Sequence, residues 1–252
     1  KIRLKIENKI DYQKNDIKGL LDLLFINRGT TFNYLIKKDS LTFNSLNTNN
    51  AYNGKIDFKP FYFAANFNYD GLSTKNLFNK DSILADFLRT DILNSKNLNA
   101  DLNLKVKDIT NIDELNNLFL EINIKQGDIS FTGSSINWRE SLRISLNESL
   151  LIQENNEINL VGKFVFDFID INNFYRTFQI KKNLRKNINQ IQIDFVYNFN
   201  KNEINFDNAK MDNKSNSKIQ KFLDNFNSKE NRIFNKVTFK NFINNFFKIY
   251  AG

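Results

Sequence analysis

The sequence predicts a mainly β protein with a few short helices, built around an extended antiparallel sheet. Apolar and polar residues alternate over most of the chain, which is typical of strands that have one apolar face and one polar face. Several of these alternating segments run for about 9 to 12 residues, which is longer than the usual strand of about 5 or 6. Phenylalanine is abundant, with 26 among 252 residues. We therefore expect long strands joined by short turns, with an aromatic apolar face.

Alternation is clearest in the middle of the chain. A strand over 98–106 has leucine, alanine and valine on one side and asparagine, aspartate and lysine on the other. The next strand, 118–124, leads into Gln126-Gly127-Asp128 and returns through Ile129 and Phe131, which predicts a hairpin. Strands are also expected over 136–138, 142–146 and 158–168, and a second hairpin over 191–199 and 204–206, with its turn at Asn200-Lys201-Asn202. Segments 32–36, 41–46, 56–58 and 61–69 alternate less regularly but are also expected to be strands, and 17–26 fits either a helix or a strand.

Helical spacing is expected only as interruptions of the sheet. Asp81 is a candidate N-cap for a helix near 81–94, and Asp170 for one near 170–180. Two further amphipathic helices are expected near 216–250, where apolar residues recur every three or four positions. No proline-rich or serine-rich linker divides the chain, whose one proline is Pro60. Residues 1–252 are therefore predicted to form a single unit, and the alternation already present at Lys1 indicates a fragment of a longer protein.

The composition removes most catalytic chemistries. The chain has no cysteine and no histidine, which excludes thiolate sites, Ser-His-Asp triads and HExxH zinc motifs. Its 8 glycines form no phosphate-binding loop, and we attribute close pairs of carboxylates to chance. The formal net charge is +8, but lysines are expected opposite the aromatic face rather than beside it, which disfavours nucleic acid as a partner. We predict a non-enzymatic protein without a cofactor or metal.

An apolar sheet face must be covered, because leaving it in water costs about 25 cal/mol per Å². A second sheet, the helices, closure into a barrel or a bound apolar ligand could each cover it. The four expected helices look too few for a sheet of about ten strands. A β-sandwich that covers its own apolar face, as a structural or adhesin-like module with Trp138 in its core, is the alternative to a ligand-binding sheet.

Five segments combine alternating strands with characteristic glycine, proline and tryptophan positions. They are GDISFTGSSINW at 127–138, LRISL at 142–146, NLVGKFVFD at 159–167, NGKIDFKPF at 53–61 and NFINNFF at 241–247. Together these segments resemble the AsmA-like family of envelope proteins, over roughly residues 50 to 250. The resemblance rests on these patterns rather than on a catalytic motif.

The resemblance implies a curled sheet whose apolar inner face forms a groove for the acyl chains of phospholipid or another lipid. It also implies a periplasmic location, anchored to the inner membrane through a segment outside this chain. The partners would be the inner and outer membranes and other envelope proteins, with lipid transport in outer-membrane biogenesis as the function. From the alternation, the lipid-facing candidates are Leu102, Leu104, Ile122, Ile144, Leu160, Phe164, Phe166, Ile193 and Phe195.

Overall fold

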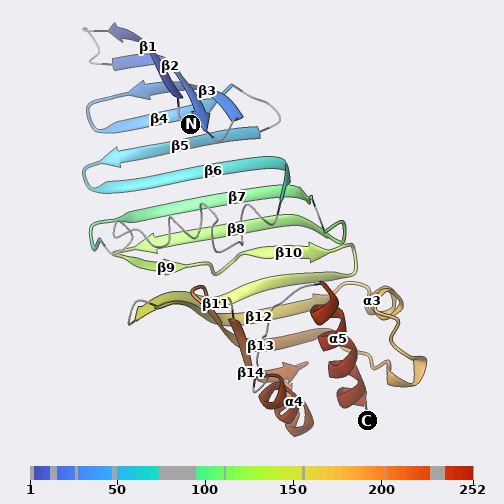
Figure 1. Cartoon of the computed structure of the whole chain (residues 1–252). Coiled ribbons are helices and arrows are strands. Elements are labelled where there is room, and N and C mark those ends of the chain that lie inside the picture. The colour runs from blue at the N-terminus through green and yellow to red at the C-terminus, as the bar shows by residue number, and fades with distance from the viewer. Residues whose placement is uncertain are drawn as a thin grey trace.

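A computed structural model shows one large curled sheet of 15 strands, which confirms the predicted fold class (Figure 1). The sheet exceeds the expected size of about ten strands, because Arg3–Asp11, Asp16–Phe25 and Lys214–Ser215 also form strands. The structure describes residues 3–11, 16–25, 28–46, 50–73, 95–110, 112–154, 157–201, 203–227 and 236–251. The helix expected near 81–94 lies outside these ranges. Within them, no helix is both long enough and apolar enough to cross a membrane.

Strands adjacent in the sequence are mostly adjacent in the sheet and pair antiparallel, as their short turns predict. The exception is β6, which pairs with β7 in parallel. The segment of the sequence that is ambiguous between helix and strand forms β2. The N-terminal strands are β1 (Arg3–Asp11), β2 (Asp16–Phe25), β3 (Arg28–Ile36), β4 (Ser40–Ser45), β5 (Asn50–Phe58), β6 (Phe61–Leu72), β7 (Asn99–Ile109) and β8 (Leu115–Lys125).

Two short strands share one place in the sheet, because β9 and β10 both lie between β8 and β11. The turn from β8 to β9 has positive φ at Gln126 (53°) and Gly127 (93°), which is the geometry of a tight hairpin. Both predicted hairpins are therefore confirmed, since β13 also pairs with β14. The C-terminal strands are β9 (Asp128–Ser130), β10 (Ser135–Trp138), β11 (Leu142–Glu154), β12 (Glu157–Phe168), β13 (Gln190–Asn198), β14 (Glu203–Met211) and β15 (Lys214–Ser215).

One face of the sheet is apolar from strand to strand, and we call it the inner face. Directly paired residues point to the same side of a sheet, so the register places Tyr52, Phe67, Leu104 and Leu120 in one row across β5 to β8. The opposite, outer face is polar. There the amide of Asn66 donates to Asn53 Oδ1 and accepts from Asn103 Nδ2, each at 3.1 Å.

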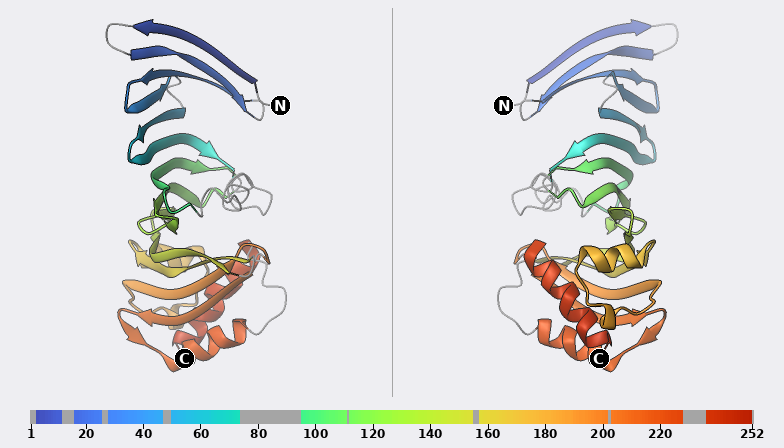
Figure 2. Two further views of the ribbon diagram at one scale, coloured as in Figure 1. Left: turned by 90° about the vertical axis from the view of Figure 1, so that its left-hand side faces the viewer. Right: turned by 90° about the vertical axis from the view of Figure 1, so that its right-hand side faces the viewer.

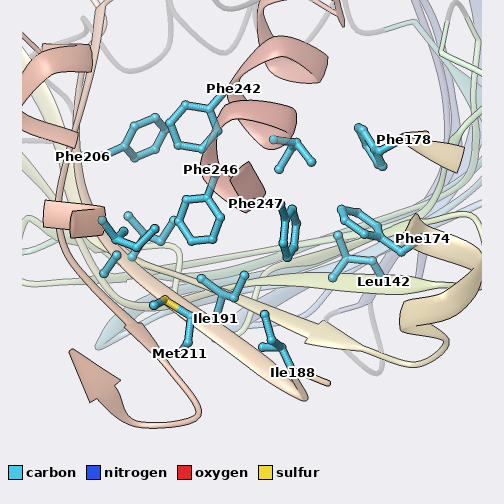
Figure 3. Close-up of a cluster of buried hydrophobic side chains, with 14 of the residues drawn as sticks. Leu142, Phe174, Phe178, Ile188, Ile191, Phe206, Met211, Phe242, Phe246 and Phe247 are labelled. Atoms are coloured by element: carbon cyan, nitrogen blue, oxygen red, sulfur yellow. The ribbon is translucent and has the colours of Figure 1, made fainter. Parts of the chain in front are cut away.

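Helices cover the inner face at the C-terminal end of the sheet (Figure 2). Helix α3 begins at the predicted cap, since Asp170 Oδ1 accepts from the backbone N–H of Asn173 at 2.9 Å. Phe246 and Phe247 of α5 point into a core that also contains Ile191 of the sheet (Figure 3). The helical elements are α3 (Ile171–Thr177), the 3-10 turn η2 (Lys182–Leu184), α4 (Ser217–Asn227) and α5 (Lys236–Ala251).

Helix α4 also covers the part of β14 that does not pair with the short last strand, β15. The side-chain amide of Asn227 accepts from the backbone N–H of Phe206 at 3.0 Å and donates to the carbonyl of the same residue at 2.6 Å. The amide thereby satisfies two backbone groups that an edge strand would otherwise present to another strand.

Tyr175 couples the stability of this helical cover to pH. Its hydroxyl donates to the carbonyl of Lys186 at 2.6 Å, the Lys186 N–H donates back at 3.2 Å, and the side chain is buried. Burial raises the pKa of Tyr175 from 10 to about 12. The folded state therefore holds this proton more tightly than the unfolded state, so its contribution to stability is complete below pH 10 and is lost as pH rises to about 12.

The substitution Tyr175→Phe is expected to lower the free energy of unfolding at pH 7 by about 1–3 kcal/mol, because it removes both hydrogen bonds between the Tyr175 hydroxyl and the Lys186 backbone. The difference in free energy of unfolding between the wild-type protein and the variant should shrink between pH 10 and 12, as measured by urea unfolding followed by circular dichroism. A difference in free energy that stays constant over this range would contradict the role assigned to the Tyr175 hydroxyl.

Candidate functional site

The inner face has a covered part and an open part. In the covered part, β10 to β14, the core includes Leu142, Ile191 and Phe206 of the sheet together with side chains from α3, α4 and α5. In the open part, β2 to β6, the only buried side chains among the described residues are Ala65 and Leu72, and Leu72 packs with Val106 and Leu118 at the far end of β6. Phe58 and Phe61 are 40% and 42% exposed there. In the described residues, the main contacts of β2 to β5 are with the neighbouring strands of the sheet.

An aromatic stripe runs across the open part. Its rings lie next to one another from β3 to β6, with centroid distances of 5.9 Å between Phe32 and Phe43 and 6.4 Å between Phe43 and Phe63. Tyr52 lies 6.1 Å from Phe32, 5.9 Å from Phe67 and 5.3 Å from Tyr69. All six side chains are half-buried. The aromatic stripe consists of Phe32, Phe43, Tyr52, Phe63, Phe67 and Tyr69.

Two glycines leave room for aromatic rings of the neighbouring strands. Gly54 pairs directly with Phe43, and a Cβ at Gly54 would lie 2.6 Å from Cε1 of that ring. Gly19 pairs with Tyr34 in the same way, and its Cβ would lie 2.6 Å from the tyrosine hydroxyl. Each ring therefore occupies the space that a side chain on the neighbouring strand would need. A larger residue at either glycine would displace the ring beside it.

Among the side chains that the structure describes, the open part carries no charge on its inner face. From Ile17 to Tyr69, no inner-face position whose side chain the structure describes is Asp, Glu, Lys or Arg. Charged groups lie on the outer face instead, where the Tyr62 hydroxyl donates to the carboxylate of Asp101 and this bond raises the pKa of the tyrosine. Among the described residues, no cluster of three acidic side chains could hold a metal ion. The chemistry available to the open part is apolar and aromatic contact.

The structure places all nine sequence-predicted residues on the inner face, as the alternation predicts, but not in one environment. Leu102 and Leu104 are half-buried in β7, next to the open part. Ile122 is 7% exposed, in a cluster formed by β7, β8 and β9. Ile144, Leu160, Phe164 and Phe166 are half-buried against the core of the covered part, and Ile193 and Phe195 are each 3% exposed within it.

Ile193 and Phe195 are therefore occupied by protein contacts. Phe195 stacks on Phe164 with centroids 4.0 Å apart, within the core that the C-terminal helices complete. Trp138, expected in a core only for a sandwich, is also buried here, 5.3 Å from Phe178 of the segment that follows α3. The described residues form a single sheet, with helices rather than a second sheet over this part. The binding roles of the nine residues stay predictions, and burial makes these two the weakest of them.

The aromatic stripe was not among the predicted site residues. Its signal is present in the sequence, since Phe61, Phe63, Phe67 and Tyr69 occupy alternate positions of one strand and Tyr52 and Phe43 precede them. Alternation alone shows that these residues share a face. It does not show that the described helices cover the other end of that face and leave this end open.

The geometry of this chain carries the functional argument. Comparison with protein-family models, with curated proteins and with solved structures finds no match.

Proposed function

We propose that the open part of the inner face binds the acyl chains of phospholipid or a similar lipid, and that the protein is a non-enzymatic lipid carrier of the bacterial cell envelope. The observation that carries the proposal is the half-buried aromatic stripe on a face that the same chain covers elsewhere. Completing the burial of one large apolar side chain contributes up to about 1.5–3 kcal/mol, so a hydrocarbon chain lying across several rings gains substantial free energy. The resemblance to the AsmA-like family supports the same ligand class and a place between the inner and outer membranes.

Site-specific crosslinking tests the proposal. Phe43 points to the inner face and Asn44, the next residue, to the outer face. A photoreactive benzoylphenylalanine at position 43 is expected to crosslink to phospholipid when the protein is expressed in bacteria and irradiated. The same group at the exposed position 44 is the matched control and should give little lipid adduct.

Mass spectrometry of the irradiated protein gives the result directly. A lipid adduct at position 43 that exceeds that at position 44 supports the proposal. Equal adducts at both positions indicate non-specific contact with membrane, and the absence of adducts at position 43 would contradict acyl-chain binding by the open part.

A further inference from the structure

The turns along one rim of the open part are rich in lysine, and we call them the basic rim. Lys37 and Lys38 lie in the turn between β3 and β4, and Lys59 in the turn between β5 and β6; both turns are at the left-hand edge of the sheet in Figure 1. These two turns are adjacent, since the N–H of Phe58 donates to the carbonyl of Asp39 at 2.9 Å.

The basic rim continues to β7 and β8. Lys96 comes just before β7, and Lys125 pairs with Asn99 at the start of that strand. The five lysines are exposed, and none has a salt bridge within the described residues. Two exposed acidic residues, Asp39 and Asp128, accompany them. The basic rim consists of Lys37, Lys38, Lys59, Lys96 and Lys125.

The opposite rim has the opposite charge. Asp70 lies near the end of β6 and Asp108 near the end of the parallel β7, and the backbone N–H of Thr110 donates to Leu72 at 3.0 Å, which joins these two strand ends. Asp113, Glu114 and Glu140 follow along this rim, where Arg139 lies 3.8 Å from Glu114. The acidic rim consists of Asp70, Asp108, Asp113, Glu114 and Glu140. The basic rim thus borders β3 to β8 and the acidic rim borders β6 to β11, so the two rims face each other across the inner face of β6 to β8.

We infer that the lipid bound in the open part is anionic, with its head group at the basic rim and its hydrocarbon on the aromatic stripe. This inference rests on the proposed function and adds the charge and orientation of the ligand. Exposed lysines attract an anionic head group over about 8 Å at physiological ionic strength, so they select the rim at which it sits. The acidic rim repels the same head group and so disfavours the reversed orientation.

Two single-chain lipids with the same tail test the inference without a membrane surface. Lysophosphatidylglycerol carries a net negative charge and lysophosphatidylcholine does not. Binding of each below its micelle concentration is measured by titration calorimetry at low and high salt. Lysophosphatidylglycerol is expected to bind about five to ten times more tightly at low salt, and the difference should fall as salt screens the lysines.

A triple variant tests whether the basic rim causes the preference for lysophosphatidylglycerol. Lys37→Glu, Lys59→Glu and Lys125→Glu together should remove the preference for lysophosphatidylglycerol and leave lysophosphatidylcholine unchanged. The matched control, Lys18→Glu, Lys105→Glu and Lys107→Glu, makes the same change in net charge on exposed outer-face positions and should keep the preference.

Each other outcome has a distinct meaning. Equal binding of the two lipids, or a preference that survives in the rim variant, would overturn the inference while leaving the proposed function standing. Displacement of lysophosphatidylglycerol by inorganic phosphate alone would overturn it by identifying a simple anion site. Failure of both lipids to bind would remove the proposed function itself.

Discussion

Replacing Phe247 with alanine is expected to lower the free energy of unfolding by about 3–5 kcal/mol, the range for truncating a fully buried phenylalanine. Phe247 has no exposed surface and contacts Tyr175 edge-on, with centroids 5.1 Å apart, as well as Phe174 and Phe246. Removing its ring leaves a cavity between α5, α3 and the sheet. Trp138 is the one tryptophan and lies in the same core, so urea unfolding followed by its fluorescence measures the change.

The same substitution at Phe61 is the matched control. Phe61 is on the inner face but is 42% exposed in the open part. We expect Phe61→Ala to cost less than about 1 kcal/mol, because most of the transfer and cavity terms are absent. Equal losses from both substitutions would show that the open part is covered as firmly as the helical end, which would contradict the division of the inner face.

Two aspartates in the aromatic stripe are expected to reduce lipid binding at least tenfold. Phe43 and Phe63 are neighbouring rings, and Phe43→Asp with Phe63→Asp would place two carboxylates where hydrocarbon is proposed to lie. An acyl chain could then bind only by desolvating both charges, which costs far more than one lost apolar contact. Phospholipid that co-purifies with the protein, measured by mass spectrometry, gives the readout.

The control for this variant adds the same charge to the outer face. Asn44→Asp with Asn68→Asp changes two positions on the polar side of the same strands, and Asn68 pairs with Lys105. Bound lipid should be unchanged in this protein. Circular dichroism should show the sheet intact in both variants, and undiminished lipid in the Phe43 and Phe63 variant would reject the aromatic stripe as the binding surface.

The sequence predicts the strands and their facing because these depend on local spacing. Alternation alone identifies the inner face of β7 and β8, the Gln126-Gly127 pair identifies a tight hairpin, and Asp170 identifies the start of α3. Each of these features depends on residues a few positions apart, so pattern and structure agree.

The division of the inner face was not predictable in the same way. Ile193 and Phe63 have equivalent patterns in the sequence, yet one is buried and the other half-buried, because α5 begins more than forty residues after Ile193 and packs back on that end. The β-bulge in β11 was also not predictable from the alternation. Its pairing with β12 shifts between Asn147 and Leu150, so Leu151 pairs with inner-face Leu160 while Leu150 is 38% exposed. Which side chains the helices cover, and where the pairing of two strands shifts its register, both depend on contacts between residues far apart in the sequence.

The Asn227 amide makes the two ends of the sheet unequal. At β14 it imitates the hydrogen bonds of a further strand, so growth of the sheet beyond the β14 backbone at Phe206 is blocked. At β1 the described part of the chain supplies no strand on the far side. A strand added beside β1, from a second molecule or another segment, would extend the apolar inner face.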